Sequence, residues 1–512
     1  MHLLGIDIGS SSIKASLVDT ETNTCSAASF QPRQEMKITA HRSGWAEQEP
    51  EMWWKYLKLA LNDIFNKTRI EKSDIKAIGI SYQMHGLVVV DKRQAVLRPA
   101  IIWCDSRAVD IGNHAFHSLG ERKCLEHLLN SPGNFTASKL KWIKENEPDI
   151  FKKIYKIMLP GDFIAMKMTG RIMTTVSGLS EGIFWDFKHN RIADILLDFY
   201  GINRELIPEI TPTFAVQGEL TSLAAKDLDL APGTLVSFRA GDQPNNALSL
   251  KVIEPGEIAA TAGTSGVVYG ISDVIRYDPL SRVNSFAHIN HTQDSPRLGL
   301  LLCVNGTGIL YSWLKHNLGD DLEYERMNAL AKKIPIGSEN LFILPFGNGA
   351  ERMLENKDLG CRISGLNFNI HNQAHIFRAA QEGIAFSFMY GMDIMKKMGA
   401  LPSIIKAGNT NLFLSPVFRD SLAGITGAVI ELYDTDGAQG AALGAGIGAG
   451  IFKSFDDAFP GNKKIQVIDP DPDQSSSYAE AYIHWKAVLE RSLMLRNQDP
   501  NPVCARAITQ KK

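Results

Sequence analysis

Two short turns of small and hydroxyl residues, each enclosed by apolar strand patterns, constrain the fold of this chain most strongly. The first joins LLGIDIG to IKASLVD through residues 10–12, and the second joins IAATAG to GVVYG through residues 264–265. Tight turns of this kind direct several backbone N–H groups one way, which suits phosphate oxygens. The recurrence indicates either two related halves or two unrelated hairpins, and the pattern alone leaves both open.

Two related halves would also account for the length of 512 residues, which exceeds a single compact core. A formal net charge of −2 argues against a nucleic-acid partner that needs a basic field. No apolar run reaches the roughly 20 residues of a membrane span, and no signal peptide precedes the first strand. Six scattered cysteines have no metal-type spacing. We therefore expect a cytoplasmic enzyme with no membrane partner.

The pattern around the turns predicts alternating helices and strands. Residues 50–65 are amphipathic and begin with a proline, which predicts a helix, and residues 75–83 predict a buried strand. Further helices are expected over residues 137–155, 375–398 and 437–452. The last of these is rich in glycine and alanine, so we expect it to pack tightly against a sheet or a nucleotide.

Acidic residues follow two of the expected strands. Asp7 ends the first strand, where its carboxylate could hold a hydrated Mg²⁺ ion, since magnesium prefers oxygen ligands. Asp242 follows the strand TLVSFRAG and could accept the proton of a substrate hydroxyl group, as a kinase requires. It is equally consistent with an N-capping aspartate. A Walker-type P-loop is absent, so the two turns are the candidate phosphate-binding elements.

Two further segments are suited to a sugar. Residues 81–86 read SYQMHG after a strand, and residues 103–107 read WCDSR. Sugar sites combine a flat apolar surface with fixed polar groups for the hydroxyls, and both segments could supply these. Taken alone, His85 is more often a structural histidine and Trp103 is more often a core residue.

With these segments in this order, the chain resembles the FGGY family of carbohydrate kinases from residue 3 to about residue 495. The motifs that carry the resemblance are GIDIGSSSIK (5–14), GWAEQEPEMWW (44–54), GISYQMHGLVVVD (79–91), LRPAIIWCDSR (97–107), AGDQPNNA (240–247), TAGTSGVV (261–268), RAAQEGIAF (378–386) and GAQGAALGAG (437–446). The resemblance implies an α/β protein with two ribonuclease-H/actin-like domains, residues 1–245 and 246–495, and a loose tail at 496–512. ATP and the sugar would meet in the cleft between the domains.

The resemblance also implies roles for individual residues. Asp242 would be the catalytic base, and Asp7 would lie near Mg²⁺ and the phosphates. The ATP-binding residues would be Ser11, Ser12, Lys14, Gly263, Thr264, Gly408, Asn409 and Gly440. The sugar-binding residues would be Gln83, Met84, His85, Trp103, Asp105 and Arg107, together with Asp242. Family members are often dimers, which leaves a homodimer open.

The tetrapeptide QMHG at residues 83–86 favours family members that phosphorylate the ketopentose D-xylulose to D-xylulose 5-phosphate. The chain departs from their pattern at Tyr82, often a glycine, in the less glycine-rich segment 407–411, at residues 243–245, and after Arg352, where a proline is lost. The alternatives are a kinase of the same family for another sugar, an aldonate or a polyol, an ATPase of the actin and heat-shock-protein type, or a catalytically silent sugar sensor.

Overall fold

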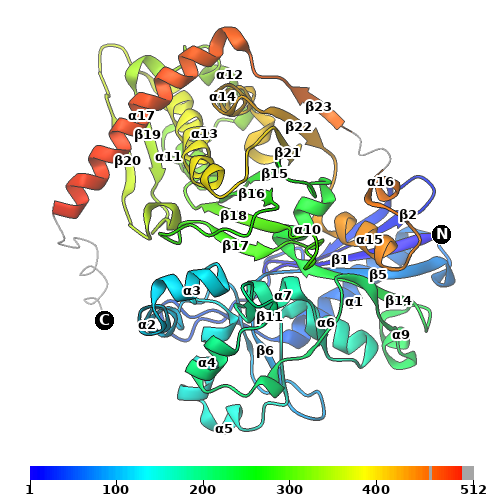
Figure 1. Ribbon diagram of the computed structural model, residues 1–512. Coiled ribbons are helices and arrows are strands. Elements are labelled where there is room, and N and C mark those ends of the chain that lie inside the picture. Colours follow the sequence, from blue (N-terminus) through cyan, green and yellow to red (C-terminus); the bar gives the residue numbers. More distant parts are fainter. Residues whose placement is uncertain (460–463, 499–512) are drawn as a thin grey trace, which may run out of the picture.

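Each hydroxyl-rich turn joins the first two strands of its own sheet, and the two sheets form the centres of two lobes (Figure 1). These features come from a computed structural model that describes residues 1–459 and 464–498. The first sheet contains β1 (His2–Ile8), β2 (Ile13–Asp19), β3 (Cys25–Gln31), β5 (Ile75–Tyr82), β13 (Phe214–Glu219) and β14 (Leu235–Gly241). The second contains β15 (Glu257–Ala262), β16 (Gly266–Ser272), β17 (Asn284–Ala287), β18 (Leu298–Val304), β21 (Ile404–Gly408), β22 (Val429–Tyr433) and β23 (Lys464–Ile468).

The two sheets share one strand order over five strands. The first runs β3-β2-β1-β5-β14 and the second runs β18-β16-β15-β21-β22. In each of these five-strand orders, the first three strands are antiparallel neighbours. The last three strands, β1-β5-β14 in the first sheet and β15-β21-β22 in the second, are parallel to one another. Helix α1 (Pro50–Lys67) makes the crossover in the first lobe and α13 (Gln373–Lys397) makes it in the second. The interpretation as two related halves therefore agrees with the topology, and the predicted ribonuclease-H/actin-like fold is confirmed.

The remaining elements surround these sheets. In the first lobe they are α2 (Val109–Leu119), α3 (Glu121–Leu128), α4 (Thr136–Asn146), α5 (Pro148–Phe151), α6 (Pro160–Thr169), α7 (Val176–Glu181), α8 (Asp194–Tyr200), α9 (Ser222–Leu228) and the short strands β4 (Glu47–Gln48), β6 (Val88–Val90), β7 (Ala100–Ile101), β8 (Lys156–Met158), β9 (Met173–Thr174), β10 (Trp185–Asp186), β11 (Arg191–Ile192) and β12 (Glu209–Ile210). The other elements are α10 (Asp242–Ser249), α11 (Gly308–Leu318), α12 (Tyr324–Ala331), β19 (Phe342–Phe346), β20 (Gly360–Ser364), α14 (Pro416–Thr426), α15 (Gly437–Gly448), α16 (Phe455–Ala458) and α17 (Pro472–Gln498).

The structure differs from the expected helix boundaries at two places. The single helix expected over residues 137–155 is wrong, because the chain forms α4 and α5 with a break at Glu147. The break has a local cause, since the residue before a proline, here Pro148, is disfavoured in helical geometry. The predicted tail begins inside α17, and its residues 499–512 lie outside the described part of the chain. Within the described residues, no helix combines the length and the apolar character that a membrane span requires.

Helix α15 comes late in the sequence but packs on the first sheet, beside β1 and β5 (Figure 1). The approach is close because both strands present glycine to the helix. A Cβ atom added to Gly5 would lie 1.7 Å from the carbonyl oxygen of Ala438, and one added to Gly79 would lie 1.9 Å from that of Ala441. The glycine- and alanine-rich composition of residues 437–448 therefore serves tight contact with a sheet, and the contact joins the two halves of the chain.

This contact leads to a prediction about stability. We expect Gly79→Ala to lower the free energy of unfolding by more than about 3 kcal/mol, because a methyl group would overlap backbone atoms that cannot move aside locally. Gly408→Ala is the matched control, since its nearest neighbour would be a side-chain carbon of Thr410 at 3.5 Å. Thermal and denaturant unfolding of both variants would measure the difference. Equal stability of the two variants would contradict the close packing of α15.

Candidate active site

The first sheet brings Asp7 and Asp242 to one edge. Strands β1, β5 and β14 are parallel, with Asp7 opposite Ser81 and Ser81 opposite Ala240, so their carboxyl ends lie together. The Ser81 hydroxyl donates a hydrogen bond of 2.9 Å to the Asp7 carboxylate. Gly241 ends β14, and Asp242 is the first residue of α10. In open sheets of this kind, ligands bind at the carboxyl ends of the strands.

The electrostatics of this edge are dominated by the half-buried carboxyl groups of Asp7 and Asp242. Burial, followed by the negative charge of Asp7, raises the pKa of Asp242 to about 7. Burial also raises the pKa of Asp7, although Lys14 and the Ser81 hydrogen bond act in the opposite direction. Asp436, the N-cap of α15, adds to the repulsion on Asp7. These oxygen atoms form a donor set that a hard cation such as Mg²⁺ would neutralise.

A third carboxyl group, Glu181 at the end of α7, is buried and was not identified from the sequence. Its pKa is raised well above the ordinary value, first by burial and then by the charge of Asp242. A Cβ atom added to Gly241 would lie 2.6 Å from a Glu181 carboxyl oxygen, so Glu181 lies directly beside the residue that precedes Asp242. Glu181 lies in none of the motifs that point to the family, and only the folded structure brings it to the site.

The first phosphate turn contains the predicted residues Ser11 and Ser12, with Lys14 following on β2. The Gly9 amide donates to the Ser12 carbonyl at 3.1 Å, which closes the turn. Ser11 and Lys14 are exposed to solvent, and Lys14 lies opposite Asp7 in the β1–β2 pairing. The turn therefore offers hydroxyl groups and a cation beside the half-buried carboxylates.

Gln48 connects this turn to the predicted sugar segment. Its side-chain amide donates to the Ser10 carbonyl at 2.7 Å, and its side-chain oxygen accepts from Trp53 at 3.0 Å and from Gln83 at 3.2 Å. Gln48 is buried, so its contacts with Trp53 and Gln83 are shielded from water, whereas the contact with Ser10 is partly buried. The family motif at residues 44–54 contained this glutamine, but its position alone did not reveal the link.

The sugar segment is held in an unusual conformation. His85 has a φ of 60°, and its main-chain carbonyl accepts a 2.8 Å hydrogen bond from Lys139. The same ammonium group donates to the Ile102 carbonyl at 3.0 Å, next to Trp103. Burial lowers the pKa of Lys139 to about 7, with Asp105 acting against the shift. Lys139 thus ties the two predicted sugar segments together.

The His85 side chain has a defined tautomer. Burial, followed by the charge of Lys139, lowers the pKa of His85 to about 3, so the ring is neutral near pH 7. Its Nδ1 atom lies 2.9 Å from the Glu181 carbonyl oxygen, which can only accept, so Nδ1 carries the hydrogen. The Nε2 atom is therefore a hydrogen-bond acceptor. The ring also contacts Phe286 of the second sheet, with centroids 5.3 Å apart, and so lies where the lobes meet.

The remaining predicted sugar residues divide into two groups. Met84 is buried beside Gly241, and Trp103 is 53% exposed with its indole nitrogen 3.4 Å from the Ser10 hydroxyl. Asp105 is fully buried and accepts hydrogen bonds from the Ala46 amide and from Arg107. The guanidinium of Arg107 stacks on Trp45 at 3.9 Å. Asp105 and Arg107 thus form a buried ion pair that supports the loop carrying Trp103.

The second phosphate turn lines a cavity of ≈ 770 Å³ in the second lobe. Gly263 and Thr264 contribute to its wall, together with Tyr311, Asn328 and residues 410–412. The carbonyl oxygens of Gly263 and Thr264 accept from the first amides of α11, at 2.9 and 3.0 Å. A second cavity, of ≈ 700 Å³, lies between residues 91–97 and 152–155 and contains none of the predicted site residues.

Three ATP-binding residues predicted after the second phosphate turn, Gly408, Asn409 and Gly440, do not line the 770 Å³ cavity. Gly408 ends β21 opposite Tyr433, and the Asn409 amide donates to the Tyr433 carbonyl at 3.0 Å. Thr410 and Asn411, which follow directly, do line the cavity. Gly440 lies on the face of α15 that packs against α10, where an added Cβ atom would be 2.7 Å from Cβ of Ser249. Its position is explained by helix packing.

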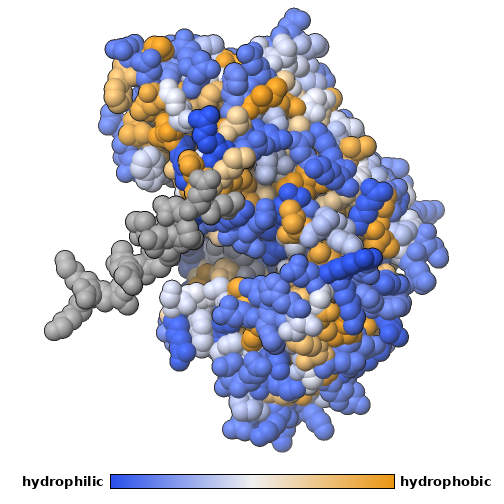
Figure 2. Space-filling view, turned by 60° about the vertical axis from the view of Figure 1, so that its left-hand side comes forward, coloured by the Kyte–Doolittle hydropathy of each residue, from blue (hydrophilic) through white to orange (hydrophobic). Residues whose placement is uncertain are grey.

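The two lobes meet next to this site. At the outer edge of β17, the Asn130 side chain bonds both main-chain groups of Ser285, at 2.7 and 3.1 Å. The hydroxyls of Ser177 and Ser180 satisfy the main-chain groups of Ala287 at 3.0 and 2.8 Å. First-lobe side chains therefore cover an edge strand of the second sheet. The space-filling view shows the lobes as separate masses with a recess between them (Figure 2).

Two sheets of the same strand order that each begin with a hydroxyl-rich turn, carboxylates at the carboxyl ends of the first sheet and a cavity lined by the second turn are typical of a phosphotransferase with the ribonuclease-H/actin-like fold. Comparison with known proteins agrees. The N-terminal domain model of the FGGY family of carbohydrate kinases matches residues 2–249, and the C-terminal domain model matches residues 258–451. The chain belongs to this family and is an ATP-dependent carbohydrate kinase.

Individual relatives are more distant. The chain is 28% identical to the xylulose kinase of Escherichia coli (strain K12) over 445 residues, which cover 86% of this chain and 88% of the relative. The crystal structure of xylulose kinase from Rhodospirillum rubrum is 25% identical, with a TM-score of 0.87, and covers 97% of this chain and 100% of that one. Gluconate kinase from Lactobacillus acidophilus, at 22% identity and a TM-score of 0.88, covers 97% and 99% and supports the fold alone.

The raised pKa of Asp242 predicts a change in stability with pH. Between its ordinary value of 3.8 and about 7, the folded protein binds a proton that the unfolded chain lacks, so stability falls as pH rises through this window. Each pKa unit corresponds to about 1.4 kcal/mol. We expect Asp242→Asn to be more stable than the wild type at pH 8, with a smaller gain at pH 5.

Thermal unfolding in a pH series would measure the effect, with Asp229→Asn as the control because Asp229 is exposed. A gain in Asp242→Asn that is the same at pH 5 and pH 8 would contradict the raised pKa.

Proposed function

We propose that this kinase transfers the γ-phosphoryl group of ATP to a hydroxyl group of a ketopentose, with D-xylulose as the first candidate and D-xylulose 5-phosphate as the product. The observation that carries the proposal is the position of Asp242, half-buried at the carboxyl end of β14 near Asp7, with its pKa raised to about 7. A general base is most effective when its pKa lies near the working pH. Asp242 is therefore suited to accept the proton of the attacking hydroxyl.

The nucleotide is expected to span the two lobes. We infer that the base and ribose occupy the cavity behind Gly263 and Thr264, and that the phosphates lie between this turn and Ser11–Ser12. Lys14 would neutralise phosphate charge, and Asp7 would hold Mg²⁺ through its oxygen atoms. When bound, the metal would supply charge neutralisation to the phosphoryl oxygens. The remaining contribution of the protein is to position the hydroxyl next to Asp242.

The sugar is expected to lie over Met84 and Trp103 with its hydroxyls directed to fixed polar groups. Neutral His85 can accept a hydrogen bond at Nε2, because its Nδ1 hydrogen is taken by the Glu181 carbonyl. Trp103 offers an exposed aromatic face next to the first phosphate turn. A neutral acceptor and a flat apolar surface suit an uncharged sugar better than an aldonate. The names of the relatives in the family, xylulose kinases, support the same choice.

The substrate can be tested by coupled ADP release with MgATP and a panel of D-xylulose, L-xylulose, D-ribulose, gluconate and glycerol. We expect the highest kcat/KM with D-xylulose. Preference for another member of the panel would keep the kinase reaction and reject the assigned sugar. Sugar-independent ATP hydrolysis, or no turnover by folded protein that binds ATP, would overturn the proposal in favour of an ATPase or a sensor.

The role of Asp242 makes a separate kinetic prediction. Asp242→Ala should lower kcat by at least about 100-fold, because loss of a general base costs roughly 10²–10⁴ in rate, with little change in ATP affinity. In the wild type, kcat/KM should fall as pH decreases below about 7, since only the ionised carboxylate can accept a proton. Steady-state assays would measure both effects, with Asp229→Asn again as the control. Near-normal turnover by Asp242→Ala would remove Asp242 from this role.

A further inference from the structure

We propose that His127, Asp186 and His189 form a binding site for one divalent transition-metal ion, with zinc as the first candidate. The three side chains come from two elements of the first lobe: helix α3 carries His127, and the hairpin between β10 and β11 carries the other two. One ligand atom from each residue lies within 4.8 Å of the other two. None of the three residues belongs to the active site described above.

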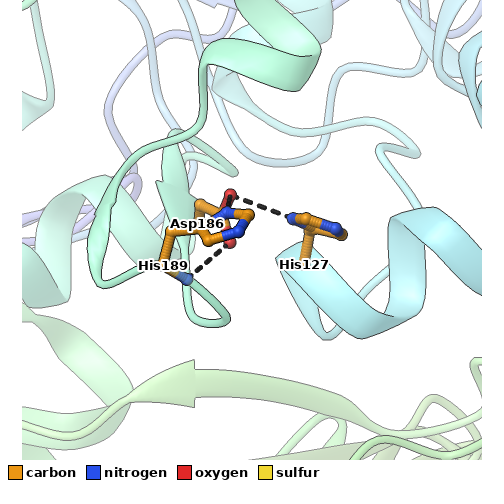
Figure 3. A group of neighbouring side chains, drawn as sticks. All are labelled: His127, Asp186 and His189. Atoms are coloured by element: carbon orange, nitrogen blue, oxygen red, sulfur yellow. Dashed lines mark hydrogen bonds and ion pairs between the residues drawn. The ribbon is translucent and has the colours of Figure 1, made fainter.

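The ligand atoms already converge. Nδ1 of His127 lies 3.0 Å from Oδ2 of Asp186, and Nδ1 of His189 lies 2.8 Å from the same oxygen. Figure 3 shows His127 extending from its helix toward the two hairpin residues. In a tetrahedral zinc site, bonds of about 2.0–2.1 Å separate neighbouring ligand atoms by about 3.3 Å. The two nitrogen–oxygen distances need to lengthen by only about half an ångström to admit the ion, and the two nitrogen atoms already lie within 4.8 Å of each other.

Main-chain groups fix the carboxylate in this orientation. The amides of Lys188 and His189 donate to Oδ1 of Asp186 at 3.0 and 3.2 Å, so Oδ2 is directed at the imidazole rings. The Phe187 amide donates to the His127 carbonyl at 2.8 Å, which joins the hairpin to the end of α3. Such outer hydrogen bonds orient ligands in known metal sites and reduce the cost of assembling them.

The donor set indicates the kind of metal. Two imidazole nitrogens and one carboxylate oxygen suit zinc and its neighbours in the first transition series, whereas Mg²⁺ and Ca²⁺ prefer oxygen alone. His127 and Asp186 are buried, but the side chain of His189 is 48% exposed. The open side leaves room for a water ligand to complete the coordination. On binding, each Nδ1 gives up its hydrogen, which is carried by Nε2 or released to solvent.

The location favours a structural effect. A metal ion would tie α3 to the β10–β11 hairpin in a region next to the second lobe. Phe187, at the centre of this hairpin, contacts the ring of His291 from the second lobe with centroids 5.9 Å apart. The bound ion would thus rigidify the part of the first lobe against which the second lobe rests. Without a metal, the same residues form a hydrogen-bonded ion-pair cluster, and this is the competing interpretation.

The test uses full-length protein freed of metals by chelation and kept free of nucleotide. Calorimetric titration with zinc and the visible absorption spectrum of the cobalt(II) complex would report binding and coordination. His189→Asn is the main variant, because an exposed side chain can change without unfolding the protein. His117→Asn is the matched control, since His117 is an exposed histidine near the end of α2. Its side chain pairs with Glu121 of α3 at 3.1 Å.

We expect one equivalent of zinc to bind, a cobalt spectrum typical of nitrogen and oxygen ligands, and affinity at least about 10-fold lower in His189→Asn. His117→Asn should bind as the wild type does. Zinc should also raise the Tm of the wild type but not that of His189→Asn. Absence of stoichiometric binding, or binding of equal strength in His189→Asn, would overturn the proposal and leave the ion-pair cluster.

Discussion

The contact between helix α15 and the first sheet is the constraint on which the arrangement of the site depends. Gly5 and Gly79 allow the helix backbone to lie directly against β1 and β5, where any side chain would collide with Ala438 or Ala441. Because α15 lies between β22 and β23 of the second sheet in sequence, this contact joins the two halves of the chain. It also brings Asp436, at the start of α15, next to the half-buried carboxylate at the end of β1.

Charge burial at that point gives the site its chemistry. Asp7 and Asp242 lie at the ends of parallel strands, and the repulsion between their carboxylates adds to the effect of burial on the pKa of Asp242. Folding therefore keeps two like charges close together, which lowers the free energy of unfolding above neutral pH. Bound cations would reduce this repulsion. Stored electrostatic strain of this kind is common where a protein places a general base. Glu181, a third carboxyl group, extends the same pattern toward the sugar segment.

Local sequence predicted the framework of this site well. Alternating apolar strands around small-residue turns were enough to place Ser11 and Gly263 in the turns between the first two strands of each sheet, and the strand ending before Asp242 was correct. Residues that act through distant contacts were not predictable in this way. Lys139 joins two loops more than thirty residues away from it through main-chain carbonyls, and nothing in its own helix indicates that role. Gly440 stays a predicted ATP-binding residue, and the structure adds a packing reason for the glycine that its motif did not reveal, since an added Cβ atom would lie 2.7 Å from Cβ of Ser249.

The most direct test of the account is the protonation of Asp242 in the protein without ligands. A ¹³C NMR pH titration of protein labelled at its aspartate side-chain carboxyl carbons would report it, with the signal assigned by its loss in Asp242→Asn. We predict a midpoint near pH 7 that moves to lower pH in Asp7→Asn, because the like charge has been removed. A midpoint near the ordinary value of 3.8, unchanged in Asp7→Asn, would contradict the claim that the half-buried carboxylates of Asp7 and Asp242 set the chemistry of the site.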